Sequence, residues 1–183
     1  MESLEAPASA YDMGHAVETE DFATFAVLVD NEPGVLHRVV GLFAARGYNI
    51  ESLTVAETEK SAHTSRITIV TRGAPHVLAQ IEAQLQKLVC TRHVQDVTKD
   101  PNGVERELAL IKVEGTGVER LEALRLSEIF RARVIDTTIS SFIFEITGAS
   151  GKIDKFVELM RPLGLLEVSR TGVLSIERGA ERL

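Results

Sequence analysis

The sequence contains little of what extracellular, membrane and metal-binding proteins need. It has one cysteine, Cys90, and no tryptophan in 183 residues. One cysteine cannot form an internal disulfide, and no CxxC or Cys/His cluster supplies zinc ligands. No stretch approaches eighteen consecutive apolar residues, so no membrane-spanning helix is expected. These absences predict a protein of the reducing cytoplasm that carries no metal and contacts no membrane.

Basic residues are also scarce. The chain has 20 Lys and Arg against 27 Asp and Glu, for a net charge of −7. An excess of negative charge removes the electrostatic attraction that non-specific binders of nucleic acid and anionic membranes rely on. A hydrophobic content of 44% instead supports a packed core. Residues 1–21 have neither the basic and apolar regions of a signal peptide nor the Arg of a transit peptide, and we predict a disordered acidic tail there.

From residue 22 onward, the hydrophobic pattern alternates between strand and helix periods. Pro33 and Gly34 break the first strand, and Gly47 is placed to end the first helix in a left-handed conformation. Pro75 suits the first turn of a second helix. The elements expected for residues 22–98 are a strand at 24–30, a helix from 35, strands at 50–56 and 65–71, a helix from 75 and a strand at 92–98.

The second half repeats this order after a Pro-Asn-Gly break, so we predict a linker at 99–105 and a second domain at 106–179. Its expected elements are a strand at 107–113, a helix with an apolar face of Leu121, Leu124, Ile129 and Phe130, strands at 134–140 and 142–147, a helix with Ile153, Phe156, Val157 and Met160, and an extended segment at 166–177 with a break at 171–172. The predicted fold class is α+β, with two ferredoxin-like βαββαβ units whose helices cover one face of an antiparallel sheet. Such small units bury a limited share of their surface, which favours at least a dimer.

Catalytic signatures are missing. The sequence lacks GxSxG, HExxH, a Walker GxxxxGK[ST] and GxGxxG, and the GTG at 115–117 has no third glycine. Each histidine stands alone, without a partner at metal-ligand or triad spacing. We therefore assign no catalytic residue, no metal ligand and no cofactor to this chain, and predict that it is not an enzyme.

The first strand, turn and helix bring polar groups and free backbone donors together. Residues 31–36 combine an amide, a Pro-Gly turn and the first N–H groups of a helix, which can hold a small carboxylate. Asn49 offers a second amide, and Ile50 and Leu53 offer apolar walls. This set suits a small hydrophobic amino acid. From the residues alone, helix capping by Asn31, a turn at Gly34 and a left-handed loop position at Asn49 remain open alternatives.

Longer segments resemble one protein family. NEPGVLHRVVGLFAARGYNIESLTV is similar to the opening ACT-domain segment of acetolactate (acetohydroxyacid) synthase small subunits. SRITIVTRG, IEAQLQKLVCTRHVQD, ERELALIKV, EIFRARVIDTT and SRTGVLSIERG resemble later segments of that family in the same order. The resemblance covers residues 24–179. NEPGVL-like turns occur in many regulators, whereas RGYNIESL and EIFRARVID are typical of this family.

The resemblance implies a non-catalytic, regulatory subunit. It implies an ACT domain at 22–98 that forms a homodimer and binds a branched-chain amino acid, typically valine, at the dimer interface. It also implies activation of a large catalytic subunit that uses thiamine diphosphate, magnesium and FAD. The family's effector-binding positions fall on Asn31, Gly34, Val35, Leu36, Asn49 and Ile50.

Three other functions compete with this interpretation. A free-standing ACT regulator of another enzyme or of transcription is the nearest, although no helix-turn-helix or basic segment supports DNA binding. A small enzyme on the same scaffold lacks a constellation of nucleophile, base and orienting group. RNA binding on the open sheet face lacks the aromatic RNP signature and has unfavourable charge.

Overall fold

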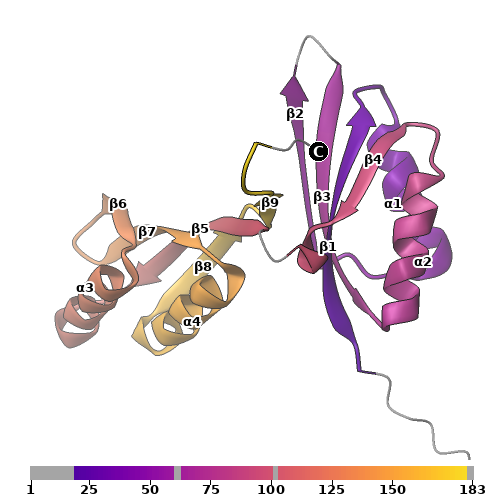
Figure 1. The fold of residues 1–183 in the computed structure, drawn as a ribbon. Helices are drawn as coiled ribbons and strands as arrows, with labels where there is room; N and C mark the ends of the chain where they lie inside the picture. The colour runs from indigo at the N-terminus through magenta and orange to yellow at the C-terminus, as the bar shows by residue number, and fades with distance from the viewer. Residues whose placement is uncertain (1–18, 60–62, 101–102, 181–183) are drawn as a thin grey trace, which may run out of the picture.

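The computed structural model describes residues 19–59, 63–100 and 103–180. It shows two α+β units, drawn in indigo to magenta and in orange to yellow in Figure 1. Residues 1–18 of the predicted tail lie outside the described residues. The elements of the first unit are β1 (Asp21–Asp30), α1 (Val35–Arg46), β2 (Ser52–Glu59), β3 (Thr64–Gly73), α2 (Pro75–Gln86), β4 (Thr91–Asp96) and the 3-10 turn η1 (Val97–Lys99).

The first unit is a four-stranded antiparallel sheet in the order β2-β3-β1-β4, with α1 and α2 on one face (Figure 1). The helix boundaries predicted from glycine and proline are found at the expected residues. Gly47 ends α1 at a φ of 68°, and Pro75 opens α2. Side chains from both helices and from the facing side of the sheet form the core, among them Phe25, Val27, Val39, Leu42, Phe43, Ile67, Ile69, Ile81 and Leu85.

The second unit repeats the topology with a different core. Its elements are β5 (Val104–Glu114), α3 (Gly117–Phe130), β6 (Arg133–Thr137), β7 (Ser141–Gly148), α4 (Ser150–Met160), the 3-10 turn η2 (Arg161–Leu163), β8 (Leu165–Arg170) and β9 (Leu174–Ile176). The sheet order is β6-β7-β5-β8, and β9 also pairs with β5. Two βαββαβ units, with helices on one face of each antiparallel sheet, confirm the predicted fold class.

The predicted apolar face of α3 is wrong in part. Leu121 and Ile129 are 69% and 61% exposed, whereas Ala123 and Ser127 are buried. Leu124 and Phe130 do pack partly against the core, as expected. Ala123, Ser127 and Phe130 follow an i, i+4, i+7 spacing, so they share the inward face, and large side chains alone misled the prediction.

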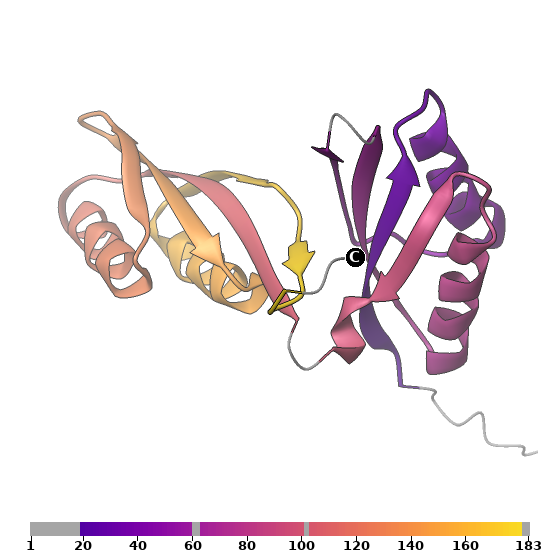
Figure 2. The same ribbon diagram turned by 45° about the horizontal axis from the view of Figure 1, so that its top comes forward.

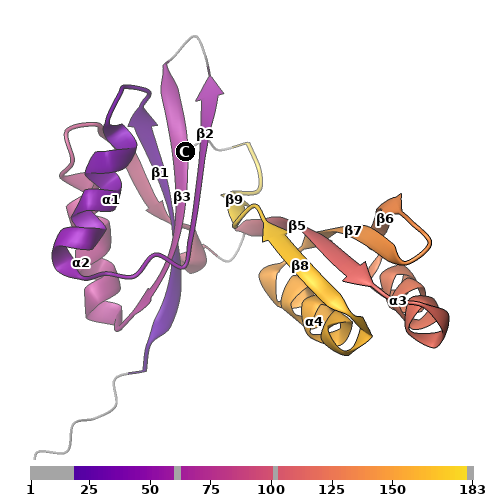
Figure 3. The same ribbon diagram turned by 180° about the vertical axis from the view of Figure 1, so that it is seen from behind.

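The extended segment at 166–177 is divided into β8 and β9 by residues 171–173. Both strands pair antiparallel with β5, so they act as one strand interrupted by an irregularity at the predicted Thr-Gly break. In two orientations, β9 lies between the two units, on the side of the first sheet opposite its helices (Figures 2 and 3). The C-terminal segment therefore covers a face that the sequence left open.

Among the described residues, no helix has the length and apolar character needed to cross a membrane.

Candidate functional site

The Asn31–Leu36 turn joins β1 to α1 and forms the first part of the predicted site. The backbone N–H of Asn31 donates to His63 O at 2.7 Å, and its Nδ2 donates to Glu57 Oε1 at 3.3 Å. Gly34 has a φ of 86°, a left-handed conformation that glycine adopts without strain. A Cβ placed on Gly34 would meet no atom of the described residues within 4 Å, so the turn faces open space.

The N-terminus of α1 receives little compensation from the described residues beyond the hydrogen bond from Val35 N–H to Glu32 O at 3.3 Å. No described side chain caps this helix, and its first turn contains no acidic residue. Val35 is 5% exposed and belongs to the core, so only its backbone can meet a ligand, whereas the Leu36 side chain is 43% exposed. Helix N–H groups and the positive end of the helix dipole favour an anion at such a position.

Asn49 and Ile50 lie between α1 and β2 and form the second part. Asn49 is exposed, its Nδ2 donates to Glu51 Oε1 at 2.8 Å, and its backbone oxygen accepts from Thr71 Oγ1 at 2.6 Å. Because the amide nitrogen only donates, Asn49 Oδ1 is the side-chain atom that can accept a hydrogen bond. Ile50 packs against the first core. A cleft of about 370 Å³ adjoins Asn49 and is also lined by Tyr48, Arg72 and Val77.

The structure does not bring these two parts together within one chain. Asn49 lies beside Thr71, which is paired with Ala23 of β1, whereas Asn31 follows the far end of that strand. Eight residues of extended chain at about 3.3 Å each separate the two amides by roughly 25 Å. One small amino acid cannot reach both.

The strand between the two parts, β2, is an edge of the first sheet. It pairs with β3 on one side, and no other described strand pairs with it. Val55, near its middle, is 45% exposed. An unpaired edge with an exposed apolar side chain is suited to pairing with another strand.

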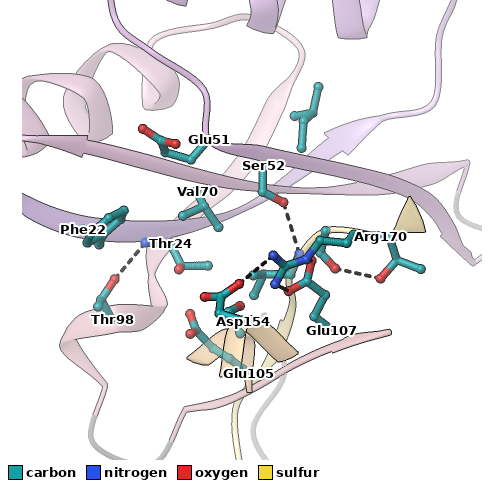
Figure 4. Close-up of a pocket in the computed structure, with 15 residues that line it drawn as sticks. Phe22, Thr24, Glu51, Ser52, Val70, Thr98, Glu105, Glu107, Asp154 and Arg170 are labelled. Carbon is teal, nitrogen blue, oxygen red and sulfur yellow. Dashed lines mark hydrogen bonds and ion pairs between the residues drawn. The ribbon is translucent and has the colours of Figure 1, made fainter. Parts of the chain in front are cut away.

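A larger cleft lies between the two units, and the sequence analysis missed it. Its volume is about 680 Å³, and its lining includes Phe22 and Ser52 from the first unit and Glu107, Asp154 and Arg170 from the second (Figure 4). Arg170 donates to both carboxylate oxygens of the buried Glu107, at 2.9 and 2.8 Å, and to Asp154 at 2.6 Å. Although burial opposes its charge, pairing with both carboxylates raises the pKa of Arg170 above its usual value.

Residues that connect the units carried only a weak sequence signal. Ser52 and Thr54 fall within a predicted strand, and Thr171 and Gly172 were predicted only to interrupt an extended segment. Their contacts join segments more than a hundred positions apart, which no local pattern reveals. Within the described part of the chain, no group of three or more His, Cys, Asp or Glu side chains could hold a metal ion.

Comparison with known proteins gives consistent family assignments for both units. Residues 25–93 match the family described as "AHAS small subunit-like ACT domain", and residues 106–179 match "Small subunit of acetolactate synthase". The chain is 48% identical to a probable acetolactate synthase small subunit of Archaeoglobus fulgidus, over 87% of this chain and 98% of that one. It is 46% identical to the acetolactate synthase isozyme 3 small subunit of Escherichia coli, over 84% and 94% of the two chains.

A solved structure agrees with the sequence comparison. The small subunit of acetolactate synthase from Thermotoga maritima superposes with a TM-score of 0.78 at 40% identity, covering 88% of this chain and 99% of that one. Both halves of the molecule, in the same order and nearly full length, thus match a single kind of protein. The chain belongs to the family of acetolactate synthase small subunits, the regulatory and non-catalytic subunits of that enzyme.

Proposed function

We propose that this regulatory subunit binds a branched-chain amino acid, with valine as the preferred effector, and passes its presence to the large catalytic subunit. The observation that supports the proposal is the arrangement of β2. Asn49 and Ile50 lie just before its first residues, Asn31 donates to Glu57 near its other end, and its outer edge is unpaired among the described strands.

Dimer formation through β2 would complete the site. When two β2 edges pair antiparallel about a twofold axis, the start of one strand lies beside the end of the other. Asn49 and Ile50 of one copy then approach Asn31 and Gly34 of the second copy. A homodimer would contain two equivalent sites, each built from both copies.

The chemistry of the two halves fits a small apolar amino acid. The uncapped N-terminus of α1 after Gly34 suits the carboxylate. Asn49 Oδ1, the hydrogen-bond acceptor of the amide, suits the ammonium group. Ile50 and the exposed Leu36 supply apolar surface for a branched side chain.

The regulatory mechanism follows from linkage. Valine shifts the dimer toward the arrangement that binds it more tightly, and catalysis responds when the two arrangements contact the catalytic subunit differently. By family resemblance, thiamine diphosphate, magnesium and FAD belong to the catalytic subunit, and the assembly functions in the cytoplasm. The small subunit activates the catalytic subunit and confers feedback inhibition by valine.

Substitution at each half of the site tests the proposal. Gly34→Asp places a carboxylate where that of the effector would bind, and Asn49→Ala removes the ammonium acceptor. Because a hydrogen bond to a charged group contributes about 1.5–3 kcal/mol, we expect each change to weaken valine binding roughly 10- to 150-fold. Calorimetric titration of the full chain with valine, leucine and isoleucine measures the affinity, and acetolactate formation by the reconstituted enzyme measures regulation.

Gly117→Asp is the matched control for Gly34→Asp. Gly117 also has a positive φ, 58°, and open space where a Cβ would lie, but it is at the start of α3 in the second unit. Its variant should bind valine normally. Unchanged valine affinity in both Gly34→Asp and Asn49→Ala would refute the site, and a wild-type chain that binds none of the three amino acids would refute the function.

A further inference from the structure

Residues 171–177, here termed the connecting segment, join the second unit to the open face of the first sheet. Thr171 N–H donates to Leu108 O of β5 at 3.0 Å, which holds the segment to the second unit. Thr54 Oγ1 donates to Thr171 O at 3.2 Å, and Val173 N–H donates to Ser52 Oγ at 3.1 Å. One short stretch of backbone thus bonds both to β5 and to β2.

Further contacts extend across the first sheet. Arg66 Nη2 of β3 donates to Ser175 O at 2.7 Å, and Gln95 of β4 donates to Glu177. Val173 and Ser175 are buried, whereas Leu174 and Ile176 between and after them are more than half exposed. Burial lowers the pKa of Arg66, an effect that Glu177 partly offsets. The segment therefore packs against the sheet with the alternation of a strand.

Gly172 fixes the closest approach between the segment and β2. Its φ is +83°, and a Cβ at this position would lie 2.5 Å from Ser52 Oγ and 2.8 Å from Thr54 Oγ1. Any larger residue must displace these hydroxyls or the segment itself. The Ser52 contact that would be lost is drawn as a dashed line in Figure 4.

The partners on β2 lie next to the proposed effector site. Ser52 follows Ile50 by two positions, and Glu51 N–H between them donates to Val70 O at 2.8 Å. A shift of β2 on effector binding or on pairing with a second copy would move Ser52 and Thr54 with it. Their bonds reach Thr171 and Val173, and through these β5.

We propose that the connecting segment transmits effector binding from β2 to the second unit, with Gly172 as the residue that keeps the two in register. This inference rests on the proposed function. It assigns Ser52, Thr54 and Gly172 a positioning role in feedback inhibition, without contact to the effector. Disruption of the segment should separate valine binding from its effect on catalysis.

The test measures binding and inhibition in the same variants. Gly172→Ala forces the segment away from Ser52 and Thr54, and Thr54→Val removes one hydroxyl with little change in shape. The free full-length chains are titrated with valine by calorimetry, and the enzyme reconstituted with the catalytic subunit is assayed at saturating valine. We expect both variants to bind valine and to activate the catalytic subunit, and Gly172→Ala to lose inhibition at saturation while Thr54→Val loses part of it.

Gly117→Ala serves as the control, because it introduces the same left-handed strain without a collision. It should keep full inhibition. Hydrogen exchange provides a second readout: valine should slow exchange of the amides at 104–108 and 171–176 in the wild-type chain, and this response should be lost in Gly172→Ala.

The outcomes separate the two proposals. Full inhibition in Gly172→Ala and Thr54→Val, with wild-type valine binding, would overturn the role of the connecting segment and leave the effector site intact. Failure of the wild-type chain to bind valine would overturn both.

Discussion

The two units share one topology, but their first helices are stabilised in different ways. Helix α1 contains three valines and an interior glycine, which are weak helix formers, yet it buries Val35, Val39, Leu42 and Phe43. Helix α3 is rich in Glu, Leu and Arg, which favour helices, and it buries only Ala123 and Ser127. An exposed ion pair between Glu122 and Arg125, at 2.5 Å, lies along α3. The stability of α1 thus comes mainly from packing against the core, and that of α3 mainly from the intrinsic helix propensity of its residues.

The two sheets also differ in burial, and the first is again the more buried of the two. The first sheet is covered on both faces, since Thr24, Ala26 and Thr68 are buried on the side opposite its helices. The second sheet ends at β6, whose five residues are all exposed. Two units with the same order of elements therefore need not bury the same surfaces. Which surfaces are buried depends on the side chains that share the inward face of each helix and sheet.

The largest expected effect comes from a pair of leucines, one on each of these helices. Leu42→Ala in α1 removes a side chain that is 7% exposed and should lower the free energy of unfolding by about 2–5 kcal/mol. Leu121→Ala in α3, at 69% exposure, should change it by less than about 0.5 kcal/mol. Urea denaturation of both variants measures the difference. Equal losses would mean that α3 is packed in solution and that the contrast between the helices is wrong.

A smaller effect is expected from enlarging the inward face of α3. Ser127 is buried, and its hydroxyl donates to Leu124 O at 2.7 Å. Ser127→Leu should overpack this position and destabilise the chain by about 1–3 kcal/mol. Ser127→Ala, which fits the same space, is the control and should leave the thermal midpoint nearly unchanged. A stabilised Ser127→Leu variant would show that the inward face has unfilled room.

The smallest effect is a gain of stability in α1. Gly41 lies inside the helix without a positive φ, and a Cβ there would meet no atom of the described residues within 4 Å. Gly41→Ala should stabilise the chain by about 0.5–1 kcal/mol, because alanine loses less backbone entropy in a helix. Thermal unfolding would detect the shift. A destabilised variant would indicate that Gly41 packs against a second copy of the chain.

Local patterns predicted much of the fold, and particular residues show why. Pro75 restricts φ through its ring, and Gly47 permits a left-handed φ because it has no Cβ, so both mark helix boundaries without reference to the rest of the chain. The face of α3 was mispredicted because its large hydrophobic side chains were expected to point inward, whereas the buried positions are those of the small Ala123 and Ser127.

The candidate site also combines features that local sequence predicts with features that only the folded chain reveals. Local patterns in the sequence were enough to predict the succession of helices and strands along the chain, the polar turn at Asn31–Leu36 and the amide at Asn49, since each depends on neighbours within a few positions. Only the tertiary structure decided that these two groups lie at opposite ends of one sheet, and that residues 171–177 bond to Ser52 and Thr54. Strand order and long-range contacts depend on the packing of the whole chain, and no local period encodes them.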